Sequence, residues 1–339
     1  MRAVQLQAIG SVGVVEVPDP EPGDGEIVVR VTAAGMCGSD RHLVSGEYPG
    51  RPPVVLGHEF EGIVVAGAVG DTVSLGDRVT VDPNIHCGVC ARCADGLVAH
   101  CTRLSAYGVD RDGGFAQHVR VLARQAHALP PELPEHLGAL SEPVACCLRA
   151  MDHADVQPGD SIAVVGGGVI GQLLVQLARL AGGTTVILST RQRRRREVAE
   201  SHGATASIDP SREDPVDAIV GPSGIVPGGV DVVFDAAGAA GSFEQAIGLA
   251  RPAGTVVVVG AAPRHLQAPI MPFDIFDREL RILGSHLNPY THARAAWLIA
   301  SGALDLEPLI TRTVGFDDLV QALTAEPAPG EIKIMLAPS

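Results

Sequence analysis

Lysine is almost absent from this chain of 339 residues. Lys333 is the only one, so a reaction mechanism that depends on a lysine side chain has almost no candidate. No stretch approaches the ~18 uninterrupted apolar residues that a membrane-spanning helix needs, so no membrane association is expected. Residues 1–10 lack a charged segment followed by a long apolar run, which predicts no signal peptide and a cytoplasmic protein.

Positive charge is also scarce. The 39 acidic residues outnumber the 25 basic ones and give a formal net charge of −14. Nucleic-acid binding requires a basic surface, so this composition argues against it. The hydrophobic content of 46% is sufficient for a large core, and the length predicts about two domains at ~150 residues each.

The order of the apolar runs divides the chain into two parts. The first part alternates short β-type runs with glycine and proline, which predicts an irregular, mostly β domain. The second part alternates apolar strands with helical segments, which predicts parallel βαβ units in a doubly wound α/β domain. The main runs are 27–31, 62–65, 78–81, 161–165, 169–180, 184–188, 230–234, 255–259 and 332–336. We expect residues 1–150 and 286–339 to form the first domain and residues 151–285 the second.

Four cysteines follow one another within about residues 86–102: Cys87, Cys90, Cys93 and Cys101. This spacing allows one short lobe to place four sulfur atoms around a single ion. Zinc takes four thiolates tetrahedrally, and such a closed set leaves no position for a substrate. We therefore expect a structural zinc site here. The alternatives are two disulfides or free buried thiols, which a reducing cytosolic setting makes less favourable than zinc.

A second set of residues suits a catalytic metal. Cys37, His58, Glu59 and Glu142 offer a thiolate, an imidazole and two carboxylates. Three protein ligands and an open position define a catalytic zinc site. We expect Cys37 and His58 to be ligands, with Glu59 as the third, either directly or in exchange with Glu142. Taken one at a time, each of these residues has a simpler interpretation as a packing or hydrogen-bonding group.

A glycine-rich turn follows one apolar strand and begins a helix. It reads Gly166-Gly-Gly-Val169-Ile170-Gly171 and fits the dinucleotide pattern G-x-G-x-x-G in the required context. Gly166 allows the tight turn, Gly168 lets the backbone approach a pyrophosphate, and Gly171 allows close helix packing. The alternative is an ordinary strand–helix turn.

The end of the next strand bears on the choice of cofactor. An acidic residue there would bind the ribose hydroxyls of NAD. The chain has Thr190 and Arg191 instead. The planar guanidinium group of Arg191 suits the 2′-phosphate of NADP, with Arg195 about one helical turn further on as a second contact. We expect NADP to be preferred and NAD to be possible. The alternative is that these arginines are solvated surface charges.

Over its whole length the chain resembles the zinc-dependent medium-chain alcohol dehydrogenases, and among them most closely the sorbitol or polyol dehydrogenases. The residues that carry this resemblance are 35–40, 57–62, the four lobe cysteines, Ser141-Glu142-Pro143 and Gly166 to Gly171. The resemblance implies a GroES-like catalytic domain, a Rossmann domain, two zinc ions per chain and hydride transfer between an alcohol and the nicotinamide. It also implies that Ser39 and His42 pass the proton to solvent.

The resemblance implies a homodimer or homotetramer as well, paired through an edge strand of the cofactor domain, for which 255–259 and 281–285 are candidates. The expected substrate is a secondary alcohol of a sugar alcohol or cyclic polyol, including aminocyclitols. Tyr48, Glu142, His286 and Asn288 are candidates for binding its hydroxyl groups. The alternatives are a butanediol or threonine type of dehydrogenase and, in another class, a non-catalytic zinc- or nucleotide-binding homologue.

Overall fold

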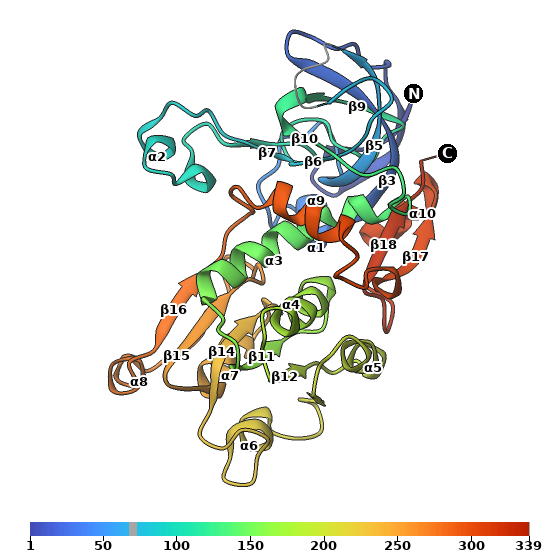
Figure 1. Cartoon of the computed structure of the whole chain (residues 1–339). Helices are drawn as coiled ribbons and strands as arrows, with labels where there is room; N and C mark the ends of the chain where they lie inside the picture. The colour runs from blue at the N-terminus through green and yellow to red at the C-terminus, as the bar shows by residue number, and fades with distance from the viewer. Residues whose placement is uncertain (68–72, 339) are drawn as a thin grey trace. The chain divides into compact units, whose positions relative to one another are not determined.

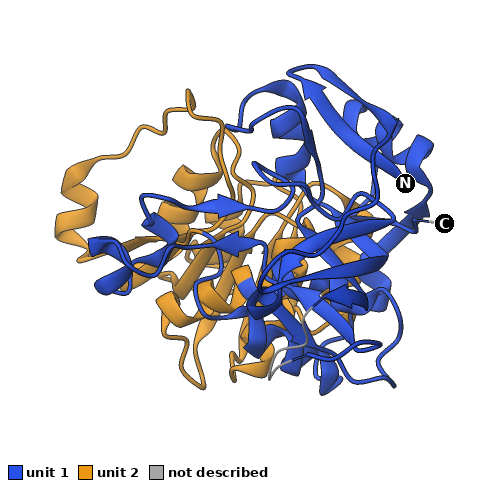
Figure 2. Ribbon diagram, turned by 90° about the horizontal axis from the view of Figure 1, so that it is seen from above, with its two compact units in different colours: residues 1–145, 287–339 blue, residues 146–286 orange. Residues whose placement is uncertain are grey.

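The computed structural model describes residues 1–67 and 73–338. The chain forms two compact units (Figure 2): unit 1, Met1–Ala145 with Leu287–Ser339, and unit 2, Cys146–His286. The division falls inside helix α3 (Ser141–Ala154). The expected boundary after residue 150 lies in the same helix.

Unit 1 is mostly β. Its strands form a seven-stranded sheet in the order β10-β6-β5-β3-β18-β17 with β9 also paired to β3, a three-stranded sheet β2-β1-β4, and a two-stranded sheet β7-β8. The strands are β1 (Arg2–Ala8), β2 (Ser11–Glu16), β3 (Glu26–Met36), β4 (Val54–Val55), β5 (Glu59–Gly67), β6 (Arg78–Val81), β7 (Asn84–Ile85), β8 (Ser105–Ala106), β9 (His118–Leu122), β10 (Ala126–Ala128), β17 (Ile310–Val314) and β18 (Lys333–Leu336).

The helices of unit 1 are short. They are α1 (Gly38–Ser45), α2 (Ala91–Ala94), α9 (His292–Ala300) and α10 (Phe316–Thr324), with 3-10 turns η1 (Val98–His100), η2 (Ala123–Gln125), η3 (Leu137–Leu140) and η4 (Glu307–Leu309). One buried cluster joins the sheets with α10, through side chains such as Val29, Phe60 and Leu319. The chain leaves the sheet through β7, forms an extension that carries α2, and returns through β8 (Figure 1).

Unit 2 is a parallel α/β domain. Its six strands are β11 (Ser161–Val165), β12 (Thr185–Ser189), β13 (Ala206–Ile208), β14 (Val230–Asp235), β15 (Ala250–Val258) and β16 (Arg281–Gly284). They lie in the order β13-β12-β11-β14-β15-β16, and every neighbouring pair is parallel. This order is that of the dinucleotide-binding fold, whose ligands bind beyond the carboxyl ends of the strands where the order reverses.

Helices cover both faces of this sheet (Figure 1). They are α4 (Val169–Leu180), α5 (Arg193–Ser201), α6 (Pro215–Val220), α7 (Ser242–Leu249) and α8 (Pro272–Asp277). Ala163 and Val165 of β11 pack in one cluster with Ala246 of α7. A Cβ atom on Gly171 of α4 would lie 3.5 Å from the side chain of Val164. Because successive side chains of a strand point to opposite faces, α4 and α7 lie on opposite faces of the sheet.

One of the two proposed edge strands is wrong. Residues 255–258 belong to β15, which pairs with β14 on one side and β16 on the other. The edge of the sheet at this end is β16, because the chain adds one more parallel strand after β15. None of the helices in residues 1–67 and 73–338 has the length and apolar content needed to span a bilayer.

Candidate metal centres and cofactor-binding turn

Three of the predicted metal ligands lie together at the ends of two paired strands in unit 1. Cys37 follows β3 and is the N-cap of α1, while Glu59 is the first residue of β5, directly after His58. The antiparallel pairing of Gly35 with Glu59 aligns these ends. One ligand atom from each of the three residues lies within 4.8 Å of the others. A thiolate, an imidazole and a carboxylate so close together form a donor set that suits zinc.

A buried carboxylate orients the histidine of this cluster. His58 Nδ1 lies 3.2 Å from Oδ1 of Asp40, whose side chain is fully buried. The backbone N–H of Cys37 donates to the other oxygen of Asp40 at 2.8 Å. Burial lowers the pKa of His58, but the charge and hydrogen bond of Asp40 raise it more, so it lies well above its ordinary value. A carboxylate beside one ring nitrogen, as Asp40 lies beside Nδ1 of His58, is an arrangement common for metal-binding histidines.

A buried ion pair holds the carboxylate of this cluster. Lys333 Nζ, on β18, lies 2.5 Å from Oε2 of Glu59 and also donates to the carbonyl oxygen of Met36 at 3.1 Å. Both charged side chains are 1% exposed. Burial lowers the pKa of Lys333, but nearby acidic groups, Glu59 foremost, raise it above its ordinary value. The ammonium group therefore stays charged and pairs with Glu59.

The other predicted catalytic groups are Glu142, Ser39 and His42. Glu142 is on α3, and the other two are on α1. Glu142 is the second residue of α3 and is buried, and its charge adds to the groups that raise the pKa of Lys333. Ser39 Oγ lies 3.3 Å from His58 Nε2. His42 is in the last turn of α1, 37% exposed, with Nδ1 2.5 Å from Oε2 of Glu47.

The four lobe cysteines also converge. They occupy the extension between β7 and β8, and one sulfur from each lies within 4.8 Å of the others. The separations between sulfur atoms are 3.5 Å for Cys90 and Cys93, 3.9 Å for Cys90 and Cys101, and 4.0 Å for Cys87 and Cys93. Four sulfurs bound tetrahedrally to zinc at ~2.3 Å would lie about 3.8 Å apart. All four are free thiols rather than disulfides.

Local hydrogen bonds in the lobe favour the thiolate forms that bind a cation. Two backbone N–H groups, those of Cys87 and Arg103, donate to Cys101 Sγ, each at 3.3 Å. Backbone N–H groups of Thr102 and Cys93 lower the pKa of Cys90 to about 5. Burial and the neighbouring thiol groups raise the pKa of Cys93 to about 12. The lobe therefore favours the thiolate form of Cys90 and disfavours that of Cys93. A bound divalent cation would stabilise both thiolates.

The glycine-rich turn has the shape that a pyrophosphate requires. Gly166 has a φ of 103°, a conformation that favours glycine. A Cβ atom on Gly171 would lie 1.9 Å from the carbonyl oxygen of Gly166, so only glycine fits where α4 meets the turn. A Cβ atom on Gly168 would meet nothing within 4 Å. This open space lies at the N-terminus of α4, which Val169 and Ile170 begin and which favours anions.

The arginine segment lies beside this turn. Val165 pairs with Ser189, and a Cβ atom on Gly167 would contact Thr190, so β12 ends against the turn. Arg191 follows, is exposed, and makes no hydrogen bond or ion pair with the residues that the structure describes. Arg196 differs, because it donates to the carbonyl oxygen of Thr190 at 2.7 Å and pairs with Asp209. Arg195 is half-buried on the first turn of α5.

Sequence reasoning missed the residues that hold the ligands in place. Asp40 lies within the segment that carries the family resemblance, and we assigned it no role. Lys333, the only lysine, carries no predicted role either. The available signal was its position, since a charged residue that begins an apolar strand near the end of the chain is expected to have a buried partner.

Comparison with known proteins places the chain in a family. Residues 23–131 match the alcohol dehydrogenase GroES-like domain, and residues 169–301 match the zinc-binding dehydrogenase domain. The D-arabitol-phosphate dehydrogenase of Enterococcus avium is 32% identical over 99% of this chain and 97% of its own length. The L-threonine 3-dehydrogenase of Thermococcus kodakarensis is 33% identical over 96% of this chain and 94% of its own length.

A solved structure agrees. A protein of Sinorhizobium meliloti 1021, described as a zinc-binding dehydrogenase bound to NADP, is 50% identical, with a TM-score of 0.98 over 99% of both chains. The chain therefore belongs to the zinc-dependent medium-chain alcohol dehydrogenase family. It is an oxidoreductase that acts on a small-molecule alcohol with zinc and a nicotinamide cofactor.

Proposed function

We propose that this chain oxidises a secondary alcohol group of a polyol to a ketone and reduces NADP. The cluster of Cys37, His58 and Glu59 carries this proposal, because three converging ligands leave one of zinc's usual four positions for a substrate. When bound, zinc supplies Lewis acidity that makes an alcohol hydroxyl more acidic, and the nicotinamide accepts the hydride. We propose Glu59 as the direct third ligand and Glu142 as a ligand in exchange with it or a hydrogen-bond partner to it.

The chain's own residues supply the path for the proton. Because Ser39 Oγ lies 3.3 Å from His58 Nε2, its hydroxyl lies beside the position that a substrate hydroxyl would take. Ser39 would accept the substrate's proton and pass it on towards His42. The Glu47 carboxylate, 2.5 Å from His42 Nδ1, orients the imidazole ring. Because the imidazole of His42 is partly exposed, it can exchange the proton with solvent in either reaction direction.

Activity measurements test this function. Zinc-loaded protein with NADP and a panel of polyols should produce reduced nicotinamide, followed by absorbance. A strong chelator should abolish the reaction, and added zinc should restore it. Failure of fully zinc-loaded protein to reduce either NADP or NAD with any alcohol would refute the proposal.

The preference for NADP rests on Arg191. Its side chain is exposed beside the glycine turn and has no partner among the described residues, so it is available for a 2′-phosphate. Arg191→Gln should lower the ratio of kcat/KM for NADP to that for NAD about 10- to 100-fold, since a charge-assisted hydrogen bond contributes about 1.5–3 kcal/mol. Arg193→Gln is the matched control, because Arg193 is already paired with Glu197 at 2.7 Å. An unchanged ratio in Arg191→Gln would exclude this role.

We propose a second, structural zinc in the lobe and a cytoplasmic location. Thiol separations near those of a tetrahedral zinc site support the first. No disulfide joins any of the seven cysteines, which suits the reducing conditions of the cytoplasm and supports the second.

A dehydrogenase of small diols or amino alcohols is the second candidate. The similarity to L-threonine 3-dehydrogenase favours it, since that relative and D-arabitol-phosphate dehydrogenase are almost equally identical to this chain. Turnover of 2,3-butanediol or L-threonine with a kcat/KM above that of every polyol would favour this candidate over the first.

A further inference from the structure

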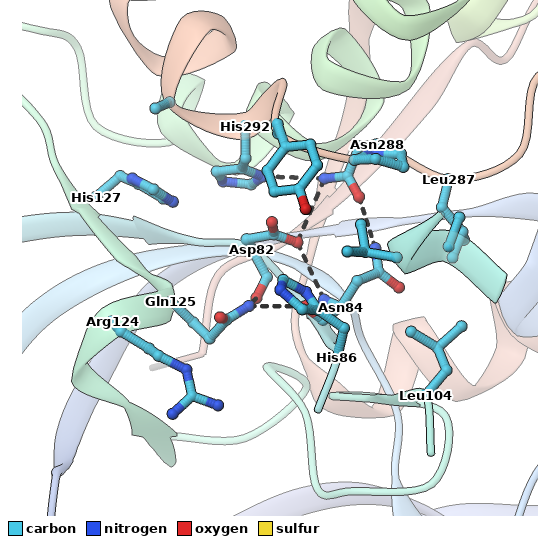
Figure 3. Close-up of a pocket in the computed structure, with 15 residues that line it drawn as sticks. Asp82, Asn84, His86, Leu104, Arg124, Gln125, His127, Leu287, Asn288 and His292 are labelled. Carbon is cyan, nitrogen blue, oxygen red and sulfur yellow. Dashed lines mark hydrogen bonds between the residues drawn. The ribbon is translucent and has the colours of Figure 1, made fainter. Parts of the chain in front are cut away.

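Unit 1 contains a pocket of about 280 Å³ that the metal centre and the glycine turn do not account for. Three segments line most of it: residues 82–86 around β7, residues 124–127 of η2 and β10, and residues 287–293, which lead into α9. The cysteine lobe closes one side through Val98, Ala99 and Leu104. Figure 3 shows Asp82, Asn84, Gln125, Asn288 and His292 gathered around one end of this pocket.

A hydrogen-bonded network fixes the polar floor of the pocket. Asn288 Nδ2 donates to Asp82 Oδ1 at 3.4 Å and contacts His292 Nδ1 at 3.3 Å, while Asn288 Oδ1 accepts from Asn84 Nδ2 at 2.6 Å. The amide of Gln125 donates to the carbonyl oxygens of Asp82 and Asn84, at 3.0 and 2.8 Å. Asn288 and His292 are each 1% exposed, so this network is preformed.

The network leaves acceptors, rather than donors, for a ligand. Asp82 Oδ2, Asn84 Oδ1 and Gln125 Oε1 accept no hydrogen bond from the residues that the structure describes. A ligand that fills this pocket must therefore bring several hydrogen-bond donors. Apolar side chains such as Leu104 and Leu287 stand across from these oxygens and suit C–H groups (Figure 3). Alternating O–H and C–H groups are the chemistry of a polyol.

The charges in the pocket disfavour a phosphate. Asp82 has no ion-pair partner among the described residues, and its carboxylate would repel a phosphate. Burial lowers the pKa of His127 and, more strongly, that of His292, so both stacked rings are neutral. Arg124, the only arginine or lysine in the lining, is exposed, and its guanidinium group points away from Asp82 (Figure 3).

The pocket is connected to the metal centre through two paired strands. Thr80 of β6 pairs with Glu61 of β5, so Asp82 and Glu59 each lie two residues beyond this pair, at the same end of the two strands. The side chain of Thr80 also links His292, at 3.2 Å, to the carbonyl oxygen of Phe60.

We propose that this pocket binds the hydroxyl groups of an unphosphorylated polyol that lie away from the reacting carbon, with Asp82 and Asn84 as the residues that select for them. This inference rests on the proposed function and deepens it. It predicts that substrates with several free hydroxyl groups are preferred over simple secondary alcohols and over polyol phosphates. Asn288 and Gln125 act as positioning residues that orient these two side chains.

Kinetics on paired substrates test the pocket. The ratio of kcat/KM for sorbitol, xylitol or myo-inositol, whichever is turned over best, to that for 2-butanol should fall at least about tenfold in Asp82→Asn, because a matched hydroxyl loses its charged acceptor. Asn84→Ala should lower the same ratio, mainly through KM for the polyol. Asp24→Asn is the control, because Asp24 is exposed and outside the pocket.

The outcomes separate the subsite from the proposed function. Equal losses on the polyol and on 2-butanol would show a structural role and overturn the subsite, as would a wild-type preference for sorbitol 6-phosphate over sorbitol. If wild-type protein turns over no alcohol, the proposed function fails, and calorimetric titration with the same polyols tests the pocket alone. Heat of binding in wild type that is lost in Asp82→Asn would then support the pocket, and no heat in wild type would overturn it.

Discussion

At the scale of single residues, two buried acid–base pairs shape the candidate catalytic site. Asp40 contacts His58, and Lys333 contacts Glu59, at 3.2 and 2.5 Å. In each pair one member is a predicted metal ligand and the other is a charged side chain that lies against it. Removing one partner of a buried pair leaves an uncompensated charge, which costs far more than losing an exposed pair.

The pair of Lys333 and Glu59 gives the first prediction. In zinc-free protein, Lys333→Met should lower the free energy of unfolding by about 3–5 kcal/mol, because it leaves the buried Glu59 carboxylate without a partner. Urea denaturation at neutral pH measures this. Glu59→Gln combined with Lys333→Met should recover much of the loss, since neither charge then remains. A loss below about 1 kcal/mol in Lys333→Met would contradict the assigned ion pair.

Asp82 gives a pH-dependent prediction. Burial raises its pKa from 3.8 to about 6, so the folded protein holds this proton more tightly than the unfolded chain. Its contribution to stability is therefore fully present below pH ~4 and is lost as the pH rises to ~6, by about 3 kcal/mol. Urea unfolding at pH 4.5 and 7 should show Asp82→Asn gaining stability relative to wild type at the higher pH. A difference between the two proteins that does not change with pH would refute the shift.

At the scale of elements, the turn between β11 and α4 separates packing from binding. A Cβ atom on Gly171 would lie 1.9 Å from a backbone oxygen, whereas one on Gly168 would meet nothing within 4 Å. Gly168 also has a φ of −67°, which any residue adopts. Gly171 is thus required by the fold, and Gly168 is required only if a ligand occupies the space beside it.

Two alanine variants test this distinction. Gly168→Ala should keep the melting temperature of wild type but raise the Kd for NADP at least about tenfold, because the methyl group occupies the pyrophosphate position. Gly171→Ala should lower the melting temperature by several degrees. Thermal unfolding and fluorescence titration measure the two effects. Wild-type cofactor affinity in Gly168→Ala would place the pyrophosphate elsewhere.

The regular elements were largely predictable because their signals are local. The apolar run 161–165 and the helical segment 169–180 match β11 and α4 as the structure has them. Ligand residue types and glycine spacing are also local features. The pair of Lys333 and Glu59 was not predictable, because 274 residues separate its members and only the pairing of β18 with β3 brings them together. The polar pocket likewise depends on segments that sequence order does not connect.

At the scale of the whole molecule, the sheet of unit 2 ends in an unpaired strand. Among the described residues, β16 pairs only with β15. Next to it in sequence, α8 exposes Phe273 and Phe276, 64% and 77% exposed, and Met271 before it is 62% exposed. Edge strands and large apolar surfaces in stable proteins are normally covered. Both features support the expected homodimer or homotetramer.

Sedimentation equilibrium tests the assembly. The mass should be two or four times the 35.0 kDa of one chain. Phe276→Asp should lower it, because a charge would then be buried against the partner. Arg264→Asp, a charge change on an exposed loop, is the control. A wild-type mass of one chain at micromolar concentration would contradict the assembly.

Zinc content measured in three proteins tests the central claim most directly. Elemental analysis of wild type, Cys37→Ser and Cys90→Ser, each purified without added zinc, should give about two, one and one zinc ions per chain. Of the two variants, only Cys90→Ser should keep dehydrogenase activity. Its activity should be proportional to the fraction of the protein that is folded. One zinc per wild-type chain, unchanged by Cys37→Ser, would leave the lobe as the only zinc site and contradict a catalytic metal at Cys37, His58 and Glu59.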